Sequence, residues 1–437
     1  MPELEGGSPG DVAKCHVLGP LEAHHDERGW FMKADGTRRA RSVRGAVVAG
    51  VLVAAACLAG CEGDEVDPGE AFVVSDSAGV EIARNVAVEE ALPRIDLSEG
   101  ALVRLGSEEE GSPELFGRVN QVRVDPEGRL WVADGLNAEL RVFALPSGEH
   151  LFTVGGPGDG PGEFALPSPL GFDEEGRAWI WDQRPGRLTI LSGEGEVVEV
   201  RRVGRDGDLT PRLLHLARGG HLWAQLPQAY TGEVRDGLVL HDTIRIGRYE
   251  SLDAEPELVA QRPGVTWYMA EMNQIAVPFA EGSRFELRDE RLVFTDPGGA
   301  PLLDVVEDGA LVRRIQVERE RERVTAGRVE AALDGPGWTP QMAEILRARR
   351  GDLPTPDLVP AWGWLRLTPD GHVFALRHGT LLQGEVWDAF DPAGRLRGVL
   401  TLPDEAHLME VTDELLVVVE MPELAGPSVA VHAFDGW

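Results

Sequence analysis

Cysteine and lysine are nearly missing from this sequence of 437 residues. The three cysteines are Cys15, Cys57 and Cys61, so the chain after residue 61 can form no disulfide and no thiolate metal site, and offers no cysteine nucleophile. Lysine occurs only at Lys14 and Lys33. Acidic residues outnumber basic ones by 74 to 42, and the net charge of −32 repels phosphates, which argues against DNA or RNA as a partner.

A short apolar run lies near the amino end. Residues 45–60 carry no charge, follow several arginines, and are too few for a bilayer span, which needs about 20 residues. This pattern is typical of a secretory signal. The run ends in Leu58-Ala59-Gly60-Cys61, which matches the bacterial lipobox, where the cysteine is acylated and becomes the new amino terminus. We therefore predict lipidation of Cys61 and a protein held on the membrane, facing the periplasm or the exterior.

Two alternatives accompany this interpretation. The run could be a plain transmembrane anchor with a chance cysteine, and Arg38-Arg39 could belong to a twin-arginine signal, although no hydrophobic pair follows at the usual distance. The polar stretch ahead of the run is long for a signal peptide, and Met32 begins a compact basic segment. We expect residues 1–60 to be a signal region, with 1–31 a misassigned gene start, and residues 61–70 to be an acidic tether.

Residues 122–155 and 171–200 repeat one another. Five positions recur at a constant offset of 48 residues, namely Asp125, Gly128, Arg129, Trp131 and Asp134, which become Asp173, Gly176, Arg177, Trp179 and Asp182. Alternating apolar residues indicate short strands, and each Asp-x-x-Gly indicates a tight turn between two of them. Four strands with a period in the forties are typical of a propeller blade.

Weaker copies centre on Gly220, Glu290, Gly371 and Glu414, which makes six units. We therefore predict an all-β fold over residues 71–437, a six-bladed β-propeller with four-stranded antiparallel blades and a short helical insertion. The extra sequence at 225–282 and 318–360 shows no further strand-turn-strand pattern, but 324–334 and 339–350 indicate two short helices.

The two ends of the chain are expected to meet in the last blade. The last repeat supplies only three strands, and we expect residues 101–106 to supply the fourth, because closing the ring removes its exposed sheet edges. Residues 71–86 are expected to form an extra hairpin ahead of the ring.

Three segments carry a family resemblance, "FGRVNQVRVDPEGRLWVADG" at 116–135, "GGPGDGPGEF" at 155–164 and "VWDAFDPAGRLRGVLTLP" at 386–403. They resemble the NHL-type six-bladed β-propellers, and more closely the bacterial lipoproteins known as "6-bladed beta-propeller". The resemblance covers about residues 72–434 and is strongest over 113–200. It implies the same fold and an envelope location, but no common activity.

Several positions that recur in the repeats have two interpretations. Asp134 and Asp182 could be metal ligands at the ends of blades, but the resemblance favours a role as turn fasteners. The recurrence of Trp131, Trp179 and Trp223 favours packing between blades over ligand stacking. The glycine-rich stretch at 155–164 lacks the Lys and Ser/Thr of a phosphate cradle, which favours a loop between blades.

The starts of the innermost strands are predicted to lie together at one mouth of a central channel. They fall at Asn120, Ser168, Arg212, Arg284, Trp364 and His407. Cations, an indole and small polar groups do not make a calcium or zinc cage, so we expect no metal ligand and no cofactor. The histidines lack ligand spacing, and no G-x-S-x-G elbow supports a catalytic serine, so no catalytic residue is assigned.

A second candidate surface is rich in arginine. Residues 313–324 and 346–350 concentrate positive charge in an otherwise acidic chain. They are either a solvated charged surface or a docking patch for an acidic partner or glycan, formed by Arg347, Arg349 and Arg350.

These observations predict a monomeric, envelope-anchored propeller that binds a protein, peptide or glycan without catalysis. Its partners would be the lipid membrane, reached through acylated Cys61, and one envelope component. The alternative is a calcium-dependent lactonase or hydrolase of the gluconolactonase type, since six-bladed propellers include such enzymes. That alternative would require calcium-binding carboxylates on the innermost strands.

Overall fold

The computed structural model describes residues 71–434, except 87–91, 96, 98–99, 204–209, 228–234, 271–272, 336–337, 380–383 and 423–424. The predicted signal region, the tether and Cys61 lie outside the described residues. In the described part, 28 strands accompany two helices, and neither helix is long and apolar enough to cross a membrane.

The strands form six sheets, numbered here along the chain. Sheet one contains β5 (Val119–Val124), β6 (Arg129–Asp134), β7 (Glu139–Ala144) and β8 (His150–Gly155). Sheet two contains β9 (Pro167–Phe172), β10 (Ala178–Asp182), β11 (Arg187–Leu191) and β12 (Val197–Arg202). Sheet three contains β13 (Arg212–Leu216), β14 (Leu222–Gln225), β15 (Val239–Tyr249), β16 (Glu257–Ala270) and β17 (Asn273–Ala276).

The last three sheets also take strands from the amino-terminal segment. Sheet four contains β18 (Phe285–Arg288), β19 (Arg291–Thr295), β20 (Leu302–Glu307) and β21 (Ala310–Glu318), joined by β1 (Phe72–Ser77) and β2 (Val80–Val86). Sheet five contains β22 (Trp362–Leu367), β23 (Val373–Arg377), β24 (Val386–Phe390) and β25 (Leu396–Thr401), joined by β3 (Arg94–Ile95). Sheet six contains β26 (Ala406–Val411), β27 (Leu415–Glu420) and β28 (Ser428–Ala433), joined by β4 (Val103–Leu105).

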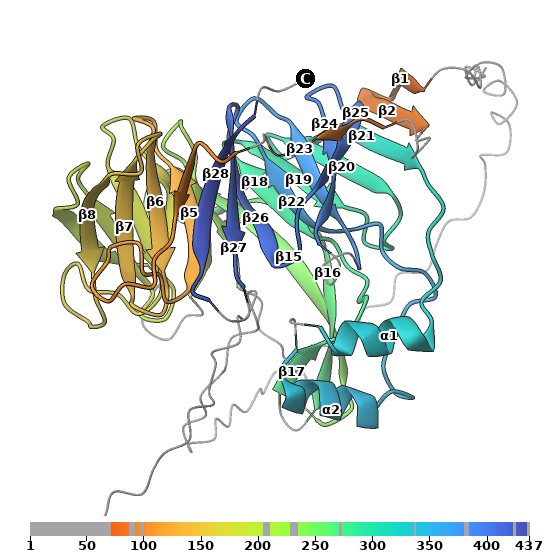
Figure 1. Ribbon diagram of the computed structural model, residues 1–437. Coiled ribbons are helices and arrows are strands. Elements are labelled where there is room, and N and C mark those ends of the chain that lie inside the picture. The colour runs from red at the N-terminus through yellow and green to blue at the C-terminus, as the bar shows by residue number, and fades with distance from the viewer. Residues whose placement is uncertain are drawn as a thin grey trace, which may run out of the picture. The chain divides into compact units, whose positions relative to one another are not determined.

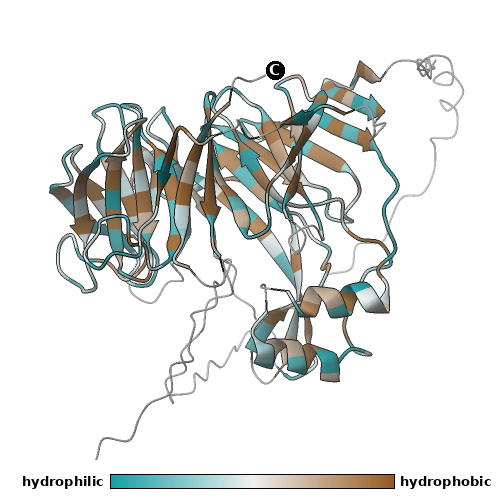
Figure 2. Cartoon of the chain, viewed as in Figure 1, coloured by the Kyte–Doolittle hydropathy of each residue, from teal (hydrophilic) through white to brown (hydrophobic). Residues whose placement is uncertain are grey.

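The first strand of each sheet contacts the first strand of the next. These six inner strands are β5, β9, β13, β18, β22 and β26, and β26 contacts β5 in turn, so the cycle is closed. The predicted fold class, an all-β six-bladed propeller, is confirmed. In Figure 2 apolar residues gather on the strands and hydrophilic residues on the connecting loops.

The Asp-x-x-Gly repeat builds the turn between the first two strands of a sheet. Asp125 Oδ1 accepts hydrogen bonds from the backbone N–H groups of Glu127 (3.0 Å) and Arg129 (2.8 Å). Gly128 has φ 76°, in the left-handed region that a side chain would disfavour. Asp173 repeats the arrangement in sheet two, so a local sequence signal sets the register of both hairpins.

The insertion in sheet three differs from our expectation. We predicted no strand-turn-strand pattern within 225–282, but Val265–Ala270 belongs to β16, and β16 pairs with β17 to give the sheet its fifth strand. Between Val265 and Asn273 the sequence contains no Gly, Pro, Asn or Asp, so it carries no turn signal ahead of β17. The number of sheets is unaffected, because β17 extends an existing sheet.

The two predicted helices are confirmed as α1 (Ala326–Leu333) and α2 (Pro340–Ala348). The hydroxyls of Thr325 and Thr339 cap them by accepting hydrogen bonds from backbone N–H groups three residues on. Figure 1 shows both helices beside β17. Their buried faces share one apolar cluster with the end of sheet three, which includes Leu333, Leu346, Ile275 and Phe279.

The amino-terminal segment lies along the outer edges of three successive sheets. The predicted hairpin at 71–86 is confirmed as β1 and β2, and β2 pairs in parallel with β21. The short strand β3 pairs in parallel with β25. The predicted closure is also confirmed, because β4 pairs with β28 and becomes the fourth strand of sheet six. Each of these edges is thereby covered.

We expect Leu105→Asp to destabilise the ring strongly, since Leu105 is 1% exposed and packs against sheet six at the closure. Burying an unpaired carboxylate there should lower the free energy of unfolding by about 3 kcal/mol or more. The matched control is Leu102→Asp, because Leu102 is 49% exposed and should tolerate the same change. Urea unfolding of both variants measures this, and equal stabilities would contradict the closure.

Candidate functional site

The structure places all six predicted mouth residues at the starts of the inner strands. Asn120, Ser168 and His407 are second in β5, β9 and β26, and Trp364 is third in β22. Arg212 opens β13, and Arg284 directly precedes β18. Arg212 is exposed and the other five are half-buried. That they bind a ligand stays a prediction.

Three members of this strand-start set are held by neighbouring protein groups. Asn120 Oδ1 accepts a hydrogen bond from Arg118 Nε at 3.0 Å, and Ser168 bonds to Gln121 of the adjacent inner strand. His407 Nδ1 lies 2.9 Å from Glu385 Oε1. Each of these side chains is oriented by one hydrogen bond within the protein.

The two arginines of the set have no carboxylate within ion-pairing distance in the described residues. Burial lowers the pKa of Arg284 to about 10, which still leaves its guanidinium charged at neutral pH. Its Nη1 atom is buried without a hydrogen-bond partner. Loss of hydration beside neighbouring protein atoms also lowers the pKa of Arg212, although the residue is partly open to solvent and the charge of Glu286 opposes the shift. Arg284 is therefore a cation with one buried, unused donor, and Arg212 is an exposed cation.

Deeper along the inner strands lies a charged network that sequence reasoning missed. Glu410 of β26 accepts Arg288 Nη1 of β18 at 2.7 Å and also pairs with Arg123 of β5. Arg366 of β22 lies 3.5 Å from Glu286 of β18. We call these five residues the axial network. Its signal in the sequence was a charge inside each apolar strand, as in "VRV" at 122–124 and "LMEV" at 408–411.

The two acids of this network respond differently to burial. Burial acts to raise the pKa of Glu410, but Arg123 and Arg288 outweigh it and hold that pKa below its usual range. Burial raises the pKa of Glu286, because Arg366 and Arg123 offset the loss of hydration only in part. Glu410 is therefore the anion that holds the network together.

The inner strands carry more positive than negative charge. The axial network and the strand-start set together contain five arginines and two glutamates. The arginines are at 123, 212, 284, 288 and 366, and the glutamates are at 286 and 410. The whole chain, by contrast, has a net charge of −32. An acidic protein thus keeps an excess of cations on its innermost strands.

This donor set does not fit a calcium ion. Calcium takes six to eight oxygen ligands, with carboxylates prominent among them. The two acids of the axial network are already bound by guanidinium groups, whose charge would repel a cation. Within the described residues no group of three or more His, Cys, Asp or Glu side chains is arranged to hold a metal ion.

The repeated aspartates hold the segments that lead into the first strands of sheets one and two, and Asp134 also fastens the turn that follows it. Asp134 accepts backbone N–H groups of Gly117 (2.7 Å) and Arg118 (3.0 Å), and Asp182 accepts those of Ala165 (2.8 Å) and Leu166 (3.0 Å). Both are fully buried. The predicted packing role of the repeated tryptophans is also confirmed, because Trp131, Trp179 and Trp223 each lie in an apolar cluster that spans two sheets.

The proposed docking patch is engaged within the chain. Arg347 pairs with Glu330 and Asp334 of the α1 region. Arg349 pairs with Asp236 at 2.6 Å, and Arg350 donates to the carbonyl of Ala326 at 2.7 Å. These contacts tie α2 to its neighbours. Docking of a partner on this patch stays a prediction.

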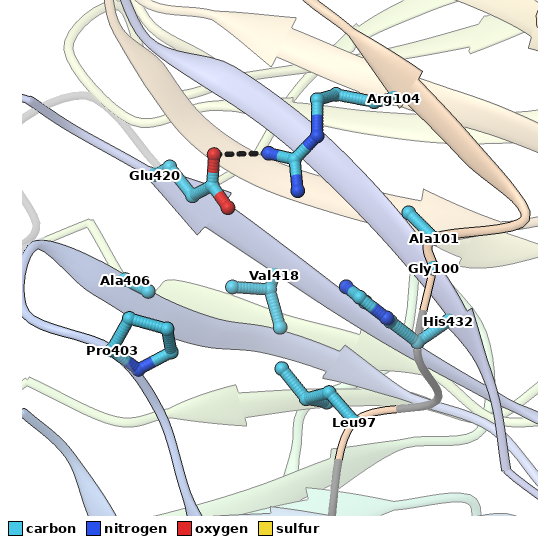
Figure 3. A pocket seen from close by; sticks show the side chains of 9 residues that line it. All are labelled: Leu97, Gly100, Ala101, Arg104, Pro403, Ala406, Val418, Glu420 and His432. Atoms are coloured by element: carbon cyan, nitrogen blue, oxygen red, sulfur yellow. Dashed lines mark hydrogen bonds and ion pairs between the residues drawn. The ribbon is translucent and has the colours of Figure 1, made fainter.

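A pocket of ≈ 280 Å³ lies against sheet six, where β4 closes it (Figure 3). Its lining includes Leu97, Val418 and the ion pair between Arg104 and Glu420. Ser428 also donates to Glu420, at 3.0 Å. Because Arg104 and Glu420 pair with each other across the closure, we assign the pocket to the closure.

No protein-family model matches the chain, and no curated protein matches it. Solved structures do resemble it at low identity. A DUF4221 family member from Bacteroides vulgatus is 9% identical, with 77% of this chain and 98% of that chain covered and a TM-score of 0.45. A catalytically inactive virginiamycin B lyase from Staphylococcus aureus is 11% identical, covering 72% and 94%, with a TM-score of 0.38.

A third similar structure is regucalcin, a calcium-binding protein from Agrobacterium tumefaciens. It is 13% identical, with 79% of this chain and 97% of that chain covered and a TM-score of 0.35. At such identities the likeness concerns the fold alone, and the activities of these proteins carry no statement about this chain.

We expect Glu410→Gln to destabilise the ring, because it leaves Arg123 and Arg288 buried without their shared anion. Breaking such a pair should lower the free energy of unfolding by about 3 kcal/mol. Glu414→Gln is the control, since Glu414 is exposed in the turn that follows β26 and should change stability by less than about 0.5 kcal/mol. Chemical denaturation decides, and a neutral Glu410→Gln would refute the network's structural role.

Stability should fall between pH 7 and pH 5 partly through His378. Burial, with the nearby charge of Arg284, lowers the pKa of His378 to about 4, whereas an unfolded histidine titrates near 6.5. The unfolded chain therefore binds the proton first, which costs about 2 kcal/mol of stability at pH 5. Between pH 7 and pH 5, the free energy of unfolding of His378→Asn should fall by about 2 kcal/mol less than that of the parent chain. A variant with the same pH dependence as the parent chain would contradict this assignment.

Proposed function

We propose that this chain is an envelope-anchored β-propeller that binds a protein, peptide or glycan, without catalysis, at the end of the ring where the inner strands begin. One observation carries the proposal. Six strands deliver chemically varied side chains to that end, and the cations Arg212 and Arg284 among them have no ion-pair partner in the described residues. Charged groups left unused on a rigid scaffold are typical of a binding surface.

The alternative surface is less suited to the task. To bind an acidic partner, Arg347 and Arg349 would first have to release Glu330, Asp334 and Asp236. Such exchanges gain little, because one ion pair simply replaces another. The strand-start set requires no such exchange at Arg212 or Arg284.

A non-catalytic role is supported by the way the acids are used. A lactonase of the calcium type would need free carboxylates on the inner strands, and Glu286 and Glu410 are both committed to arginines. The repeat that carries Asp125, Trp131 and Asp134 supports placing the ring among the NHL-type propellers, and the lipobox supports its place among the envelope lipoproteins.

Anchoring through Cys61 is tested by Cys61→Ser. We expect this variant to stay unprocessed or to leave the membrane, because the thioether to lipid cannot form on serine. Cys57→Ser is the matched control, since it alters a cysteine in the same apolar run and should leave lipidation intact. Mass spectrometry and membrane fractionation report the result. An acylated, membrane-bound Cys61→Ser protein would disprove lipid attachment at this residue.

The binding face is tested by photo-crosslinking in intact membranes with two variants. Trp364→Ala removes the half-buried indole at the strand starts, and should abolish capture of the partner seen with the parent chain. The combined Arg347→Gln, Arg349→Gln and Arg350→Gln variant should retain that partner.

The reverse pattern would move the binding face to α2. Purified protein is also assayed for bound metal and for lactone and ester turnover. Stoichiometric calcium with turnover lost on chelation would overturn the non-catalytic proposal.

A further inference from the structure

We propose that Arg212 and Arg284 form a seat for an oxyanion, a carboxylate or a phosphate, carried by the ligand that binds at the strand starts. This inference rests on the proposed function and names the chemistry that the bound partner must present.

The first step is the position of Arg284, which the backbone around it fixes. Gly282 has φ 132°, and a Cβ there would lie 2.1 Å from the carbonyl oxygen of Gly264 in β16. Only glycine permits this approach. Ser283 N donates to the Pro263 carbonyl at 3.0 Å, and Arg284 N donates to Thr295 Oγ1 at 2.9 Å. The inserted strand β16 therefore clamps the segment that presents Arg284.

The second step is the charge state of that side chain. No ion pair to Arg284 occurs in the described residues, and its Nη1 atom is buried without a partner. A guanidinium with a pKa of about 10 stays protonated at pH 7. A buried cation that keeps its charge and lacks an anion favours an anion from outside.

The third step brings in Arg212 from the neighbouring strand. β13 and β18 are adjacent inner strands, and Arg212 is close enough to Glu286, two residues beyond Arg284, for their charges to interact. Glu286 itself pairs with Arg366 at 3.5 Å, so it does not neutralise both arginines. Because Arg212 is exposed, it offers the first contact to a ligand that approaches from solvent.

The fourth step concerns two uncharged polar side chains beside Arg284. Ser283 Oγ and His378 Nδ1 are buried without hydrogen-bond partners. His378 is within electrostatic reach of Arg284, and its low pKa keeps the ring neutral at pH 7. A hydroxyl and a neutral imidazole can each contribute a hydrogen bond to an oxyanion without adding charge. Arg284, the preceding Ser283 and the nearby His378 thus each carry a buried polar atom without a hydrogen-bond partner.

The ligand class follows from guanidinium geometry. The planar fork of arginine matches two oxygens of one carboxylate or phosphate group, and such charge-assisted bonds are among the stronger polar contacts in proteins. Neutral ligands would leave both guanidinium groups unpaired. The seat therefore selects for acidic ligands, although the protein surface as a whole repels them.

The test is calorimetric titration of the full chain in detergent with citrate and, separately, with inorganic phosphate, at constant ionic strength. We expect saturable binding of at least one probe, and the preferred probe distinguishes a carboxylate from a phosphate ligand. Arg284→Gln and Arg212→Gln should each weaken binding about tenfold or more, because each removes charge-assisted hydrogen bonds. Arg284→Lys should fall between the parent and Arg284→Gln, since it keeps the charge and loses the fork.

The control is Arg201→Gln, which removes an exposed, paired arginine from β12 and should bind the probe as the parent does. If Arg284→Gln fails to fold, the exposed Arg212→Gln variant still decides. The seat is overturned if neither probe shows saturable binding. It is also overturned if Arg284→Gln and Arg212→Gln both bind the probe as tightly as the parent chain does. If these variants still capture the partner, the seat is refuted and the proposed function stands. If the parent chain binds the anion but captures no partner, the seat stands and the proposed function is refuted.

Discussion

The pairing of β4 with β28 is the constraint on which the ring depends. Sheet six has only three strands from the carboxyl-terminal end, and residues 103–105 supply the fourth from far earlier in the chain. Without that strand the edge of β28 would expose unpaired backbone groups. The same amino-terminal segment also covers β21 and β25, so one stretch of chain stabilises three consecutive sheets. Closure by β4 holds sheet six beside sheet one, so that side chains of the last and first sheets can meet.

The axial network is what closure makes possible. Glu410 lies in sheet six, whereas Arg123 and Arg288 come from sheets one and four, so their contact requires a completed ring. The acids of the network pair with its arginines, and the cations nearer the strand starts have no ion-pair partner in the described residues. The arrangement thus separates a structural group of charges from a pair that is available to a ligand.

Much of this fold could be predicted from the sequence, and the reasons are local. The Asp-x-x-Gly turns and alternating strands of sheets one and two are encoded within a few residues, as are the caps of α1 and α2. The closure by 101–106 followed from counting strands. The β16–β17 pairing was missed because no turn residue marks it. Local signals predict elements, but not every connection between them.

The axial charges could not be placed from alternation alone. Bulges interrupt the register in β5 between Val119 and Gln121, and in β26 between Leu408 and Glu410. One extra residue reverses which face each later side chain occupies. Counting from Asn120 or His407 therefore does not show that Arg123 and Glu410 meet. His407 precedes the irregularity of its strand, whereas Asn120 and Trp364 lie within the irregularities of β5 and β22.

The most direct test of the oxyanion seat is a crystal structure of the full chain with selenate, an oxyanion that gives an anomalous signal. We predict a closed ring with an anomalous peak within hydrogen-bonding distance of Arg284 and Arg212. A ring in which Arg284 pairs with a carboxylate of its own chain, with no selenate at the strand starts, would contradict it.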